Sequence, residues 1–404
     1  MMGITQPDVL FSEQVQPGQP EEVESAIPLF IGYTLTGSPW TLTAINRLSD
    51  FETTFGGPCD GGPVLYYAVA HYFDNGGRGG FVLSLGNWSS ETTAANFLSA
   101  LSDPQIIEAV AAEPRLSLVA VPDMVLLPDD DNGLWSQAWL ALLAICQARE
   151  GIFGLFDSPD DANNASAALL AFSTSSPSGA EYGAAYWPRL VTSYQDGNGH
   201  AIVVPPSAAV AAVIEATDAR IGVWQAPANV ALAQTIKPTQ PWQRSEGLFQ
   251  QDAASFNLIR SFAGRGTRIW GCRTLVSDTA SPWLYVPARR LMSYVENQTG
   301  QIGMRFVFEP NTALTWVKVR SLMYLWLREL WIAGGLVGEE ESEAFDIQIG
   351  LNETMTEEDI QQGKTIVKIR LAIACPAEFI TVSLTFNSRM SGGVALSVKE
   401  DILV

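Results

Sequence analysis

The sequence predicts an α/β domain followed by an α+β domain, with an extended arm at each end of the chain, and three observations carry this prediction. At 404 residues the chain is longer than a single domain usually is. From residue 26 onward, short apolar stretches alternate with longer helical patterns, which is typical of a largely parallel sheet. After Pro238 and Pro241 the composition changes, because arginine becomes frequent and β-branched stretches return.

These observations divide the chain into four segments. We expect an N-terminal arm at residues 1–25, the α/β domain at residues 26–245, the α+β domain at residues 246–385 and a C-terminal arm at residues 386–404. The first segment is polar and contains three prolines, which is typical of an arm. Because 47% of the residues are hydrophobic, ordinary packing can stabilise both domains.

In the first domain, apolar strand patterns and helical patterns follow one another. Strands are expected at residues 27–33, 81–85, 116–121, 152–156 and 190–193, and helices at residues 63–74, 94–101, 105–112, 134–149, 162–172 and 204–220. Asp196-Gly-Asn-Gly-His200 is typical of a turn. This alternation predicts helices packed against a mostly parallel sheet.

The second domain combines strands with two helices. Strands or extended segments are expected at residues 257–261, 268–273, 283–286, 305–308, 344–352, 366–374 and 379–386, and helices at residues 287–299 and 311–333. The longer helix is expected to start at an Asn311 N-cap and to end at Gly334-Gly335. Residues 354–363 predict a loop with a helical turn.

Each arm contains one short strand pattern without a partner nearby in the sequence. The apolar residues are Val9, Leu10, Phe11 and Val15 in the first arm and Val394, Leu396 and Val398 in the last. An unpaired strand leaves backbone donors and acceptors unsatisfied, and addition to the edge of another chain's sheet satisfies them. Pairing within the chain's own fold fits the pattern equally well, so both alternatives stay open here.

The chain is strongly acidic, with 43 Asp plus Glu against 23 Lys plus Arg and a net charge of −20. Such a chain repels phosphate backbones, so nucleic acid is not expected as a partner. Residues 1–245 carry a net charge of −17 and residues 246–404 a net charge of −3. Arginines cluster in the second domain and predict a locally positive surface or ordinary solvated charge. They are Arg260, Arg265, Arg268, Arg273, Arg289, Arg290 and Arg305.

Nothing in the sequence predicts secretion or membrane insertion. The first thirty residues contain five acids and no Lys or Arg, and no stretch reaches about 18 uninterrupted apolar residues. The four cysteines lie far apart without a CxxC pair, which favours free thiols over disulfides or a zinc site. We therefore expect a chain that folds in the cytoplasm.

Catalytic and cofactor signals are weak. Asp123, His200 and the serines at residues 173–176 could form a Ser-His-Asp set, but no G-x-S-x-G motif surrounds any serine. Gly264-Arg265-Gly266 does not continue into a phosphate-binding motif, and the aspartates at residues 129–131 lack the spacing of a calcium loop. We expect no catalytic residue, cofactor or metal.

The long helix at residues 311–333 is apolar around most of its circumference, which is typical of a helix buried in a core or an interface. Lys318, Arg320 and Arg328 interrupt this apolar surface. Internal salt bridges are favoured for these cations, and an acidic partner is the alternative.

The second half of the chain resembles contractile tail sheath proteins, because eight of its segments match segments of that family in the same order. They are Val204-Pro-Pro-Ser207, residues 217–229, Asn257-Leu-Ile-Arg260, residues 264–274, residues 286–291, Phe306-Val-Phe-Glu-Pro-Asn311, residues 331–336 and Pro376-Ala-Glu-Phe-Ile380. The first half is similar more loosely, at residues 51–57, 73–77 and 182–188. The family's Pro-Gly-Val-Tyr start corresponds here only to Pro7-Asp8-Val9-Leu10.

The resemblance implies a structural subunit that stacks in sixfold rings around an inner tube and contracts to drive the tube through a target envelope. It implies an outer subtilisin-like domain without catalytic residues, an inner C-terminal domain, and arms that enter the sheets of neighbouring subunits. It further implies contacts with tube, baseplate and terminator proteins, and Lys318, Arg320 and Arg328 would face the tube. The particle would be assembled in the cytoplasm as a phage tail or a released tail-like particle. The compact length resembles sheaths of R-type pyocins and extracellular contractile injection particles.

Two other functions stay open. A catalytically divergent subtilisin-like hydrolase predicts a soluble monomer with a reactive side chain. The second is a non-contractile structural protein, such as a tail tube or baseplate component. A tube protein would normally be a much shorter chain than this one.

Overall fold

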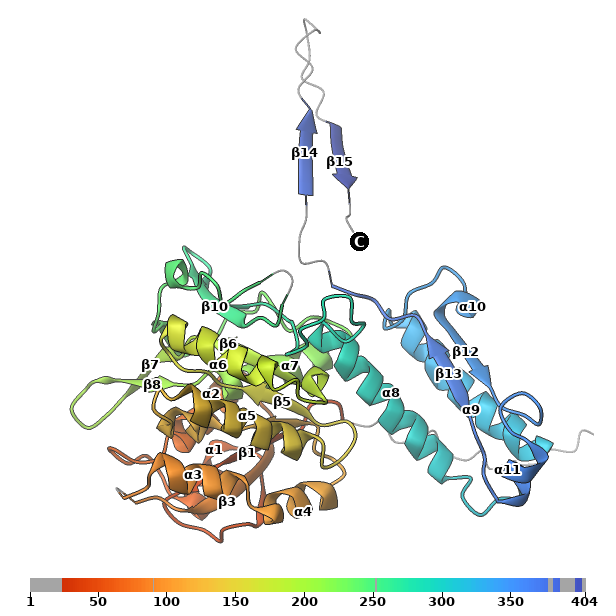
Figure 1. Cartoon of the computed structure of the whole chain (residues 1–404), viewed down its shortest axis with the longest axis horizontal. Helices are drawn as coiled ribbons and strands as arrows, with labels where there is room; N and C mark the ends of the chain where they lie inside the picture. Colours follow the sequence, from red (N-terminus) through yellow and green to blue (C-terminus); the bar gives the residue numbers. More distant parts are fainter. Residues whose placement is uncertain (1–23, 90, 251–252, 377–380, 386–396, 402–404) are drawn as a thin grey trace, which may run out of the picture.

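The chain folds into a large sheet domain, a smaller domain built around two long helices, and a C-terminal hairpin (Figure 1). The computed structural model describes residues 24–89, 91–250, 253–376, 381–385 and 397–401, and the last two ranges are described by their backbone only. Helices α8 (Val286–Met304) and α9 (Ala313–Ile332) define the smaller domain, which we call the α8–α9 domain.

The sheet domain is built on eight strands in the order β11-β10-β6-β5-β4-β1-β3-β2. The strands are β1 (Pro28–Thr34), β2 (Leu42–Ile45), β3 (Gly80–Asn87), β4 (Leu118–Ala120), β5 (Phe153–Phe156), β6 (Gly183–Trp187), β10 (Asn257–Phe262) and β11 (Gly266–Trp270). The six inner strands run parallel, whereas β2 and β11 are antiparallel to their neighbours. Every residue of β1, β4, β5 and β6 is buried, as expected for parallel strands covered on both faces.

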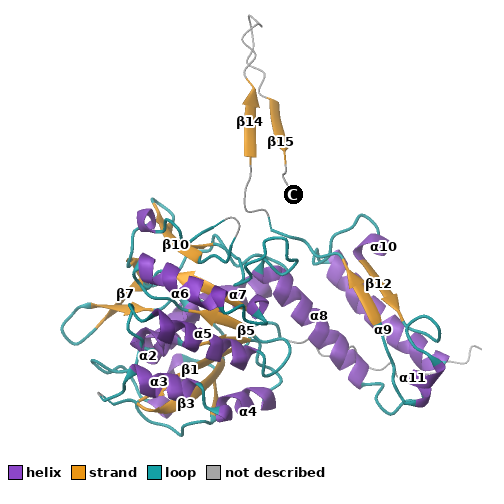
Figure 2. Cartoon of the chain, viewed as in Figure 1, coloured by secondary structure: helices purple, strands orange, loops and turns teal. Residues whose placement is uncertain are grey.

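Helices cover both faces of this sheet (Figure 2). They are α1 (Leu48–Phe55), α2 (Leu65–Asp74), α3 (Ala94–Leu101), α4 (Pro104–Ala112), α5 (Asn132–Cys146), α6 (Ala162–Thr174) and α7 (Ser207–Arg220), with short 3-10 turns η1 (Pro122–Leu126), η2 (Ala180–Tyr182) and η3 (Trp242–Arg244). Alternate residues of β1 enter two cores, because Leu29 and Ile31 pack with α3 to α6 and Phe30 packs with α1, α2 and α7.

Aspartates begin three helices of the first core. Asp103, Asp131 and Asp161 accept hydrogen bonds from the backbone N–H groups of Gln105, Leu134 and Asn163, at 2.9, 3.0 and 2.9 Å. Each bond satisfies a donor that a helix start leaves free. Local sequence therefore sets where α4, α5 and α6 start.

A smaller three-stranded sheet packs beside the large one. It has the order β8-β7-β9, with β7 (Leu190–Gln195), β8 (Ala201–Val204) and β9 (Thr235–Pro238). The turn between β7 and β8 is the predicted one, because the backbone N–H of His200 donates to the Asp196 carboxylate at 2.8 Å.

The α8–α9 domain packs its two helices against an antiparallel ribbon of two strands. The ribbon is β12 (Phe345–Gln348) and β13 (Lys368–Leu371), and the short helices are α10 (Glu341–Ala344) and α11 (Glu357–Gln361). Leu327 and Leu330 of α9 pack with Phe345, while Val319 and Met323 pack with Ile349. Helix α9 ends where Gly334 adopts φ of 90°, a conformation that glycine reaches without strain.

A buried ion pair joins the two domains at the start of the described chain. The Arg290 guanidinium of α8 donates to both carboxylate oxygens of Asp218 in α7, at 3.0 and 2.6 Å. It also donates to the carbonyl of Ser25 at 2.9 Å, and the Ser25 hydroxyl donates to Asp218 at 2.7 Å. One guanidinium thus connects α7, α8 and the segment that precedes β1.

The last two strands, β14 (Thr381–Thr385) and β15 (Ser397–Asp401), pair with each other antiparallel. The hairpin stands clear of both domains in Figure 1. The predicted strand at residues 379–386 is therefore confirmed as β14, and of the two alternatives left open for the C-terminal strand, the structure shows pairing within the chain.

Most other predicted elements are confirmed, including the parallel sheet and every predicted helix, whereas α1, β2, β8 and β9 were not predicted. Four details differ. The boundary predicted after residue 245 falls inside the sheet domain, because β10 pairs with β6. Residues 283–286 contribute one isolated bridge, Arg273 with Tyr285, and residues 305–308 form a turn. The N-cap of α9 is Thr312, because the Asn311 side chain instead accepts a hydrogen bond from Trp316 Nε1 at 2.6 Å.

None of the helices in the described parts of the chain is both long enough and apolar enough to cross a membrane.

Candidate assembly surfaces

The residues predicted for the two arms fall mostly outside the described part of the chain. Val9, Leu10, Phe11, Val15, Val394 and Leu396 lie outside it. Val398 lies in β15, opposite Leu384 of β14. A two-stranded hairpin is at best marginally stable by itself in water, and each of its outer edges can accept another strand.

The basic residues of α9 all form salt bridges inside the α8–α9 domain. Lys318 pairs with Glu309 at 3.3 Å, Arg320 with Glu353 at 3.0 Å and Arg328 with Glu341 at 2.7 Å. The prediction that these cations are paired internally is confirmed. Their contact with a tube stays a prediction.

Helix α9 presents an apolar stripe to solvent on the side away from the ribbon. Leu314, Val317, Leu325 and Ile332 recur at helical spacing, and Leu314 is 68% and Leu325 is 56% exposed. We expected α9 to be buried in a core or an interface, and within the described chain only the side that faces the ribbon is buried. Ser321 and Arg328 interrupt this stripe, and its apolar residues are available for contact with another protein.

Another apolar feature, missed from the sequence, lies in the turn between α8 and α9. Met304 and Val307 are exposed there, and the Phe308 side chain is 102% exposed with φ of 76°. A positive φ is uncommon for a bulky residue and is retained where its surroundings impose it. Sequence patterns favoured an extended segment here because Phe306-Val307-Phe308 is rich in β-forming residues.

A stack of aromatic and arginine side chains covers the β10–β11 side of the sheet domain. The Arg260 guanidinium lies 4.7 Å from the centre of the Trp242 ring and 5.3 Å from that of Phe262. The Phe262 ring is 4.7 Å from that of Trp270, and Arg265 lies 6.0 Å from Phe262. Trp242 and Trp270 are both exposed. We call Trp242, Arg260, Phe262, Arg265, Trp270 and the neighbouring Arg244 of η3 the Arg–Trp patch.

Only some of the arginines in the arginine-rich stretch therefore lie on the protein surface. Arg260 and Arg265 lie in the Arg–Trp patch, whereas Arg289 and Arg290 are buried. Gly264 and Gly266 flank Arg265 with φ of 72° and 73°. They form the turn between β10 and β11.

An open groove of about 440 Å³ crosses one end of the β12–β13 ribbon and is lined by residues 342–346 and 370–372. Leu371 and the edges of the buried Ala344 and Phe345 give it apolar surface, Glu343 gives it a carboxylate, and Asp346 is paired with Arg370 at 2.7 Å. Glu339 and Glu340 precede it in the sequence. Within the described ranges, neither of these two nor Glu343 forms a salt bridge. We call this surface the α10 groove.

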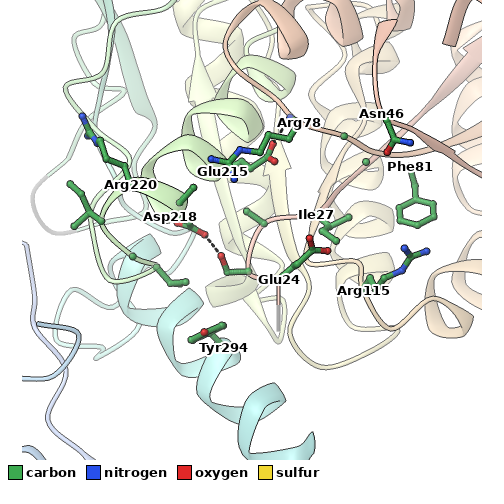
Figure 3. Close-up of a pocket in the computed structure, with 18 of the residues that line it drawn as sticks. Glu24, Ile27, Asn46, Arg78, Phe81, Arg115, Glu215, Asp218, Arg220 and Tyr294 are labelled. Carbon is green, nitrogen blue, oxygen red and sulfur yellow. Dashed lines mark hydrogen bonds between the residues drawn. The ribbon is translucent and has the colours of Figure 1, made fainter. Parts of the chain in front are cut away.

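A second cavity, of about 680 Å³, lies between the sheet, α7 and α8 (Figure 3). Three acidic side chains line it, and Asp218 and Glu215 are already hydrogen-bonded, whereas Glu24 is exposed. Asp218 takes the bonds from Arg290 and Ser25 described above, and Glu215 accepts from the Tyr72 hydroxyl at 2.6 Å and the Arg78 backbone at 3.1 Å. Burial raises the pKa of the Glu215 carboxyl. The two acids contributed by α7 therefore serve to hold neighbouring segments in place.

The structure does not assemble the possible Ser-His-Asp set. The Asp123 carboxylate is fully buried and accepts the backbone N–H groups of Tyr33 at 2.6 Å and Leu65 at 3.2 Å. Gly32 leaves room for it, since a Cβ there would lie 2.6 Å from Asp123 Oδ2. Burial raises the pKa of Asp123 to about 7, against the effect of these donors. His200 is instead bound to Asp196 at 3.2 Å in an exposed turn.

The other carboxylate at this edge of the sheet serves a helix start. Asp157 follows β5 and accepts from the Ser207 N–H at 3.0 Å and from its hydroxyl at 2.6 Å, at the first residue of α7. Burial raises the pKa of Asp157 to about 7. His71 is bound to Ala233 and Thr235, both at 3.0 Å. Among the described residues, no serine hydroxyl is hydrogen-bonded to a histidine.

No described group of three His, Cys, Asp or Glu side chains is arranged to hold a metal ion. Asp129 of the acidic triplet forms a salt bridge with Arg189 at 2.6 Å.

Comparison with known proteins gives matches to sheath and baseplate proteins of contractile particles. The sequence profile of the phage tail sheath C-terminal domain matches residues 278–387. A chain in the contracted baseplate of the anti-feeding prophage is 39% identical, with a TM-score of 0.85, over 96% of this chain and 100% of that one. A chain of the contracted sheath complex of the extracellular contractile injection system PVC is 28% identical, with a TM-score of 0.72, over 96% and 99% of the two chains. No curated protein matches.

One more distant match concerns the fold alone. The sheath tail protein Lin1278 from Listeria innocua is 11% identical, with a TM-score of 0.57, over 87% of this chain and 96% of that one.

Proposed function

The chain belongs to the contractile tail sheath family, and from this premise we propose that it is a sheath subunit that polymerises helically around an inner tube. Contraction of the polymer drives the tube through a target envelope. The observation that carries this proposal is the likeness, over nearly the whole of both chains, to proteins of contractile particles seen in the contracted state.

The termini would connect neighbouring subunits. The β14–β15 hairpin stands clear of both domains, so it can reach a neighbour without disturbing either core. Its outer edges offer backbone groups for sheet addition, and each added strand contributes a few bonds of about 1 kcal/mol net. Such a link is modest by itself and becomes strong by repetition along a lattice.

The α8–α9 domain would face the tube, through α9. The exposed stripe of Leu314, Val317, Leu325 and Ile332 supports this, because it is apolar surface on the one helix that also carries Lys318, Arg320 and Arg328. Those cations are already paired with Glu309, Glu353 and Glu341. The contact with the tube would therefore be mainly apolar, with little net charge on the α9 side. Such a contact would allow the sheath subunit to release the tube during contraction.

Contraction would be a rigid-body movement of subunits from a metastable lattice into a better-packed one. The Arg290–Asp218 pair supports movement of each subunit as a unit, because it holds α7 and α8 together in a buried contact. Firing would need no nucleotide, since the energy is stored during assembly.

The subunit would have no enzymatic activity. In the part of the chain that the structure describes, the carboxylates Asp123 and Asp157 are occupied by backbone groups and Ser207. A sheet domain derived from a subtilisin-like ancestor fits this arrangement, in which a serine begins α7 at the carboxyl edge of the sheet without a histidine partner.

The further partners would be baseplate and terminator proteins at the two ends of the sheath, with six subunits in each ring. Assembly would take place in the cytoplasm, as part of a phage tail or a tail-like particle that is later released. Neither nucleic acid nor membrane insertion enters this function, and the net charge of −20 supports the first exclusion.

Electron microscopy of the purified chain tests the proposal. The intact chain is expected to form hollow cylinders, and chains lacking residues 1–20 or 393–404 are expected not to. A chain lacking only residues 402–404 is the matched control, because it keeps β15 complete. Dispersed monomers of the intact chain, with or without tube protein, would contradict the proposal.

A second candidate is a structural subunit confined to the baseplate end, which the match to a baseplate chain of the anti-feeding prophage favours. It predicts single rings or short stacks with tube and baseplate proteins in place of long cylinders. The same images separate the two candidates by polymer length.

A further inference from the structure

The two domains differ in how many of their basic side chains form salt bridges. Among described residues, those of α9 are all neutralised by acids of their own domain, as are Lys364 and Arg370. Arg244, Arg260 and Arg265 of the Arg–Trp patch form no salt bridge within the described chain. In a protein with only 23 Lys and Arg, three unneutralised guanidiniums beside exposed rings are an unusual concentration of positive charge.

The patch is also preorganised. Arg260 is held between the rings of Trp242 and Phe262, and its Nε atom is buried without a hydrogen-bond partner in the described structure. Arg265 is fixed by a hydrogen bond from its Nη2 to Asn229 at 3.1 Å. Stacked Trp and Arg side chains lose little conformational entropy on binding, and they dominate protein interfaces for that reason.

The α10 groove has the complementary chemistry. Leu371 and the edge of Phe345 offer an aromatic ring apolar surface, and the groove's volume of about 440 Å³ exceeds that of an indole side chain. Glu339, Glu340 and Glu343 add carboxylates that no described cation neutralises.

The two surfaces lie on different domains of the same chain, with β10 and α10 at opposite sides of α8 in Figure 1. They cannot meet within one molecule. A contact between two different surfaces of identical chains is heterologous, so it repeats from copy to copy and generates a ring or a helix.

We propose that the Arg–Trp patch of one subunit binds the α10 groove of a second copy of this chain, with Trp242 against the apolar surface and the arginines against the α10 carboxylates. The contact rests on the proposed sheath function and adds to it a link between domains that does not use the arms. Because it is partly electrostatic, salt weakens it.

Charge reversal on each side tests the contact. Arg244→Glu with Arg265→Glu reverses the patch. Glu339→Arg with Ser342→Arg removes the net negative charge that Glu339, Glu340 and Glu343 give the groove, and it leaves the Glu340–Glu343 capping box of α10 in place. Each double variant alone is expected to need at least a tenfold higher concentration to form cylinders. An equimolar mixture of the two is expected to recover assembly, because the arginines introduced in one variant then meet the glutamates introduced in the other.

The matched control is Arg47→Glu with Arg115→Glu, which makes the same charge change at exposed positions outside the patch. It is expected to assemble as the unmodified chain does. Trp242→Ala is expected to weaken assembly with no change of net charge. Unchanged assembly of the patch variant, equal loss in the control, or no recovery in the mixture would each overturn the proposal.

The proposal and the sheath function fail in different ways. If the sheath function is wrong, the unmodified chain forms no cylinders, yet sedimentation of the mixed variants still detects pairs of chains at low salt. If only the contact is wrong, cylinders form and neither reversal affects them.

Discussion

The sheet domain and the α8–α9 domain bury their apolar residues to different degrees. The sheet domain has two continuous cores and places Trp135, Trp139 and Trp187 fully inside. The α8–α9 domain has two small cores, and α9 exposes a stripe that includes Leu314 and Leu325. The first domain can therefore be stable alone, whereas the second keeps apolar surface free that only a partner can cover.

Removing a central ring of the sheet domain is expected to have the largest effect. Trp139 is fully buried, contacts the rings of Phe156, Phe172 and Phe256, and donates to the Asp157 carbonyl at 2.9 Å. Trp139→Ala is expected to lower the free energy of unfolding by about 4 kcal/mol, through the cavity it leaves. Urea denaturation measures this. A loss under about 1 kcal/mol would refute a tightly packed core.

Breaking the ion pair between the domains is expected to come next. Asp218→Asn leaves the Arg290 guanidinium, whose side chain is only 3% exposed, without a counter-charge. The expected loss is about 3 kcal/mol, because an uncompensated buried charge is costly. Separate unfolding transitions for the two domains would appear in calorimetry.

The control for that variant is Glu309→Gln, which breaks the exposed pair with Lys318. It is expected to cost about 0–1 kcal/mol. Equal losses for the two variants would mean that burial of Arg290 does not matter.

Two leucines of α9 lie on opposite faces of the helix, one packed in the core and the other exposed to solvent. Leu327 is fully buried, while Leu325 is 56% exposed. Leu327→Ala is expected to cost about 2–3 kcal/mol of unfolding free energy, and Leu325→Ala less than about 0.5 kcal/mol. In assembled cylinders the order of effects on polymer yield is expected to reverse. A large loss of monomer stability from Leu325→Ala would show that this face is already covered within the chain.

The pH dependence of stability tests the buried carboxyl of Asp157, and it changes no contact of either domain. Its pKa in the folded chain, about 7, lies above its ordinary value of 3.8 because of burial. Its stabilising contribution is therefore complete below pH 3.8 and is lost as the pH rises through 7. The slope is at most about 1.4 kcal/mol per pH unit.

Asp157→Asn isolates this effect, because the amide oxygen can still accept the Ser207 N–H and cannot ionise. Denaturation of both chains between pH 4 and pH 8 is expected to show the unmodified chain losing stability relative to the variant as the pH rises. A constant difference across that range would contradict an elevated pKa.

Elements whose cause is local could be predicted from the sequence. Helix α3 was predicted with the observed bounds, and α4 and α6 begin at aspartate caps that are visible in the sequence. The strands β1 and β5 were predicted because runs of buried apolar residues lie next to glycine and turn signals. The turn at Gly264 and Gly266 follows from the conformational freedom of glycine. The family resemblance also rested on ordered short motifs.

Features that depend on contacts distant in the sequence required the tertiary structure. Strand β10 extends the first sheet because it pairs with β6, about 70 residues earlier, and no composition change marks that pairing. The partner of β15 is β14, across residues 386–396. The sequence also could not separate Arg265, exposed in the Arg–Trp patch, from Arg290, buried against Asp218, because both occur in the same arginine-rich stretch. Hydrophobic periodicity and capping act within a few residues, whereas strand partners and ion pairs are chosen by packing in space.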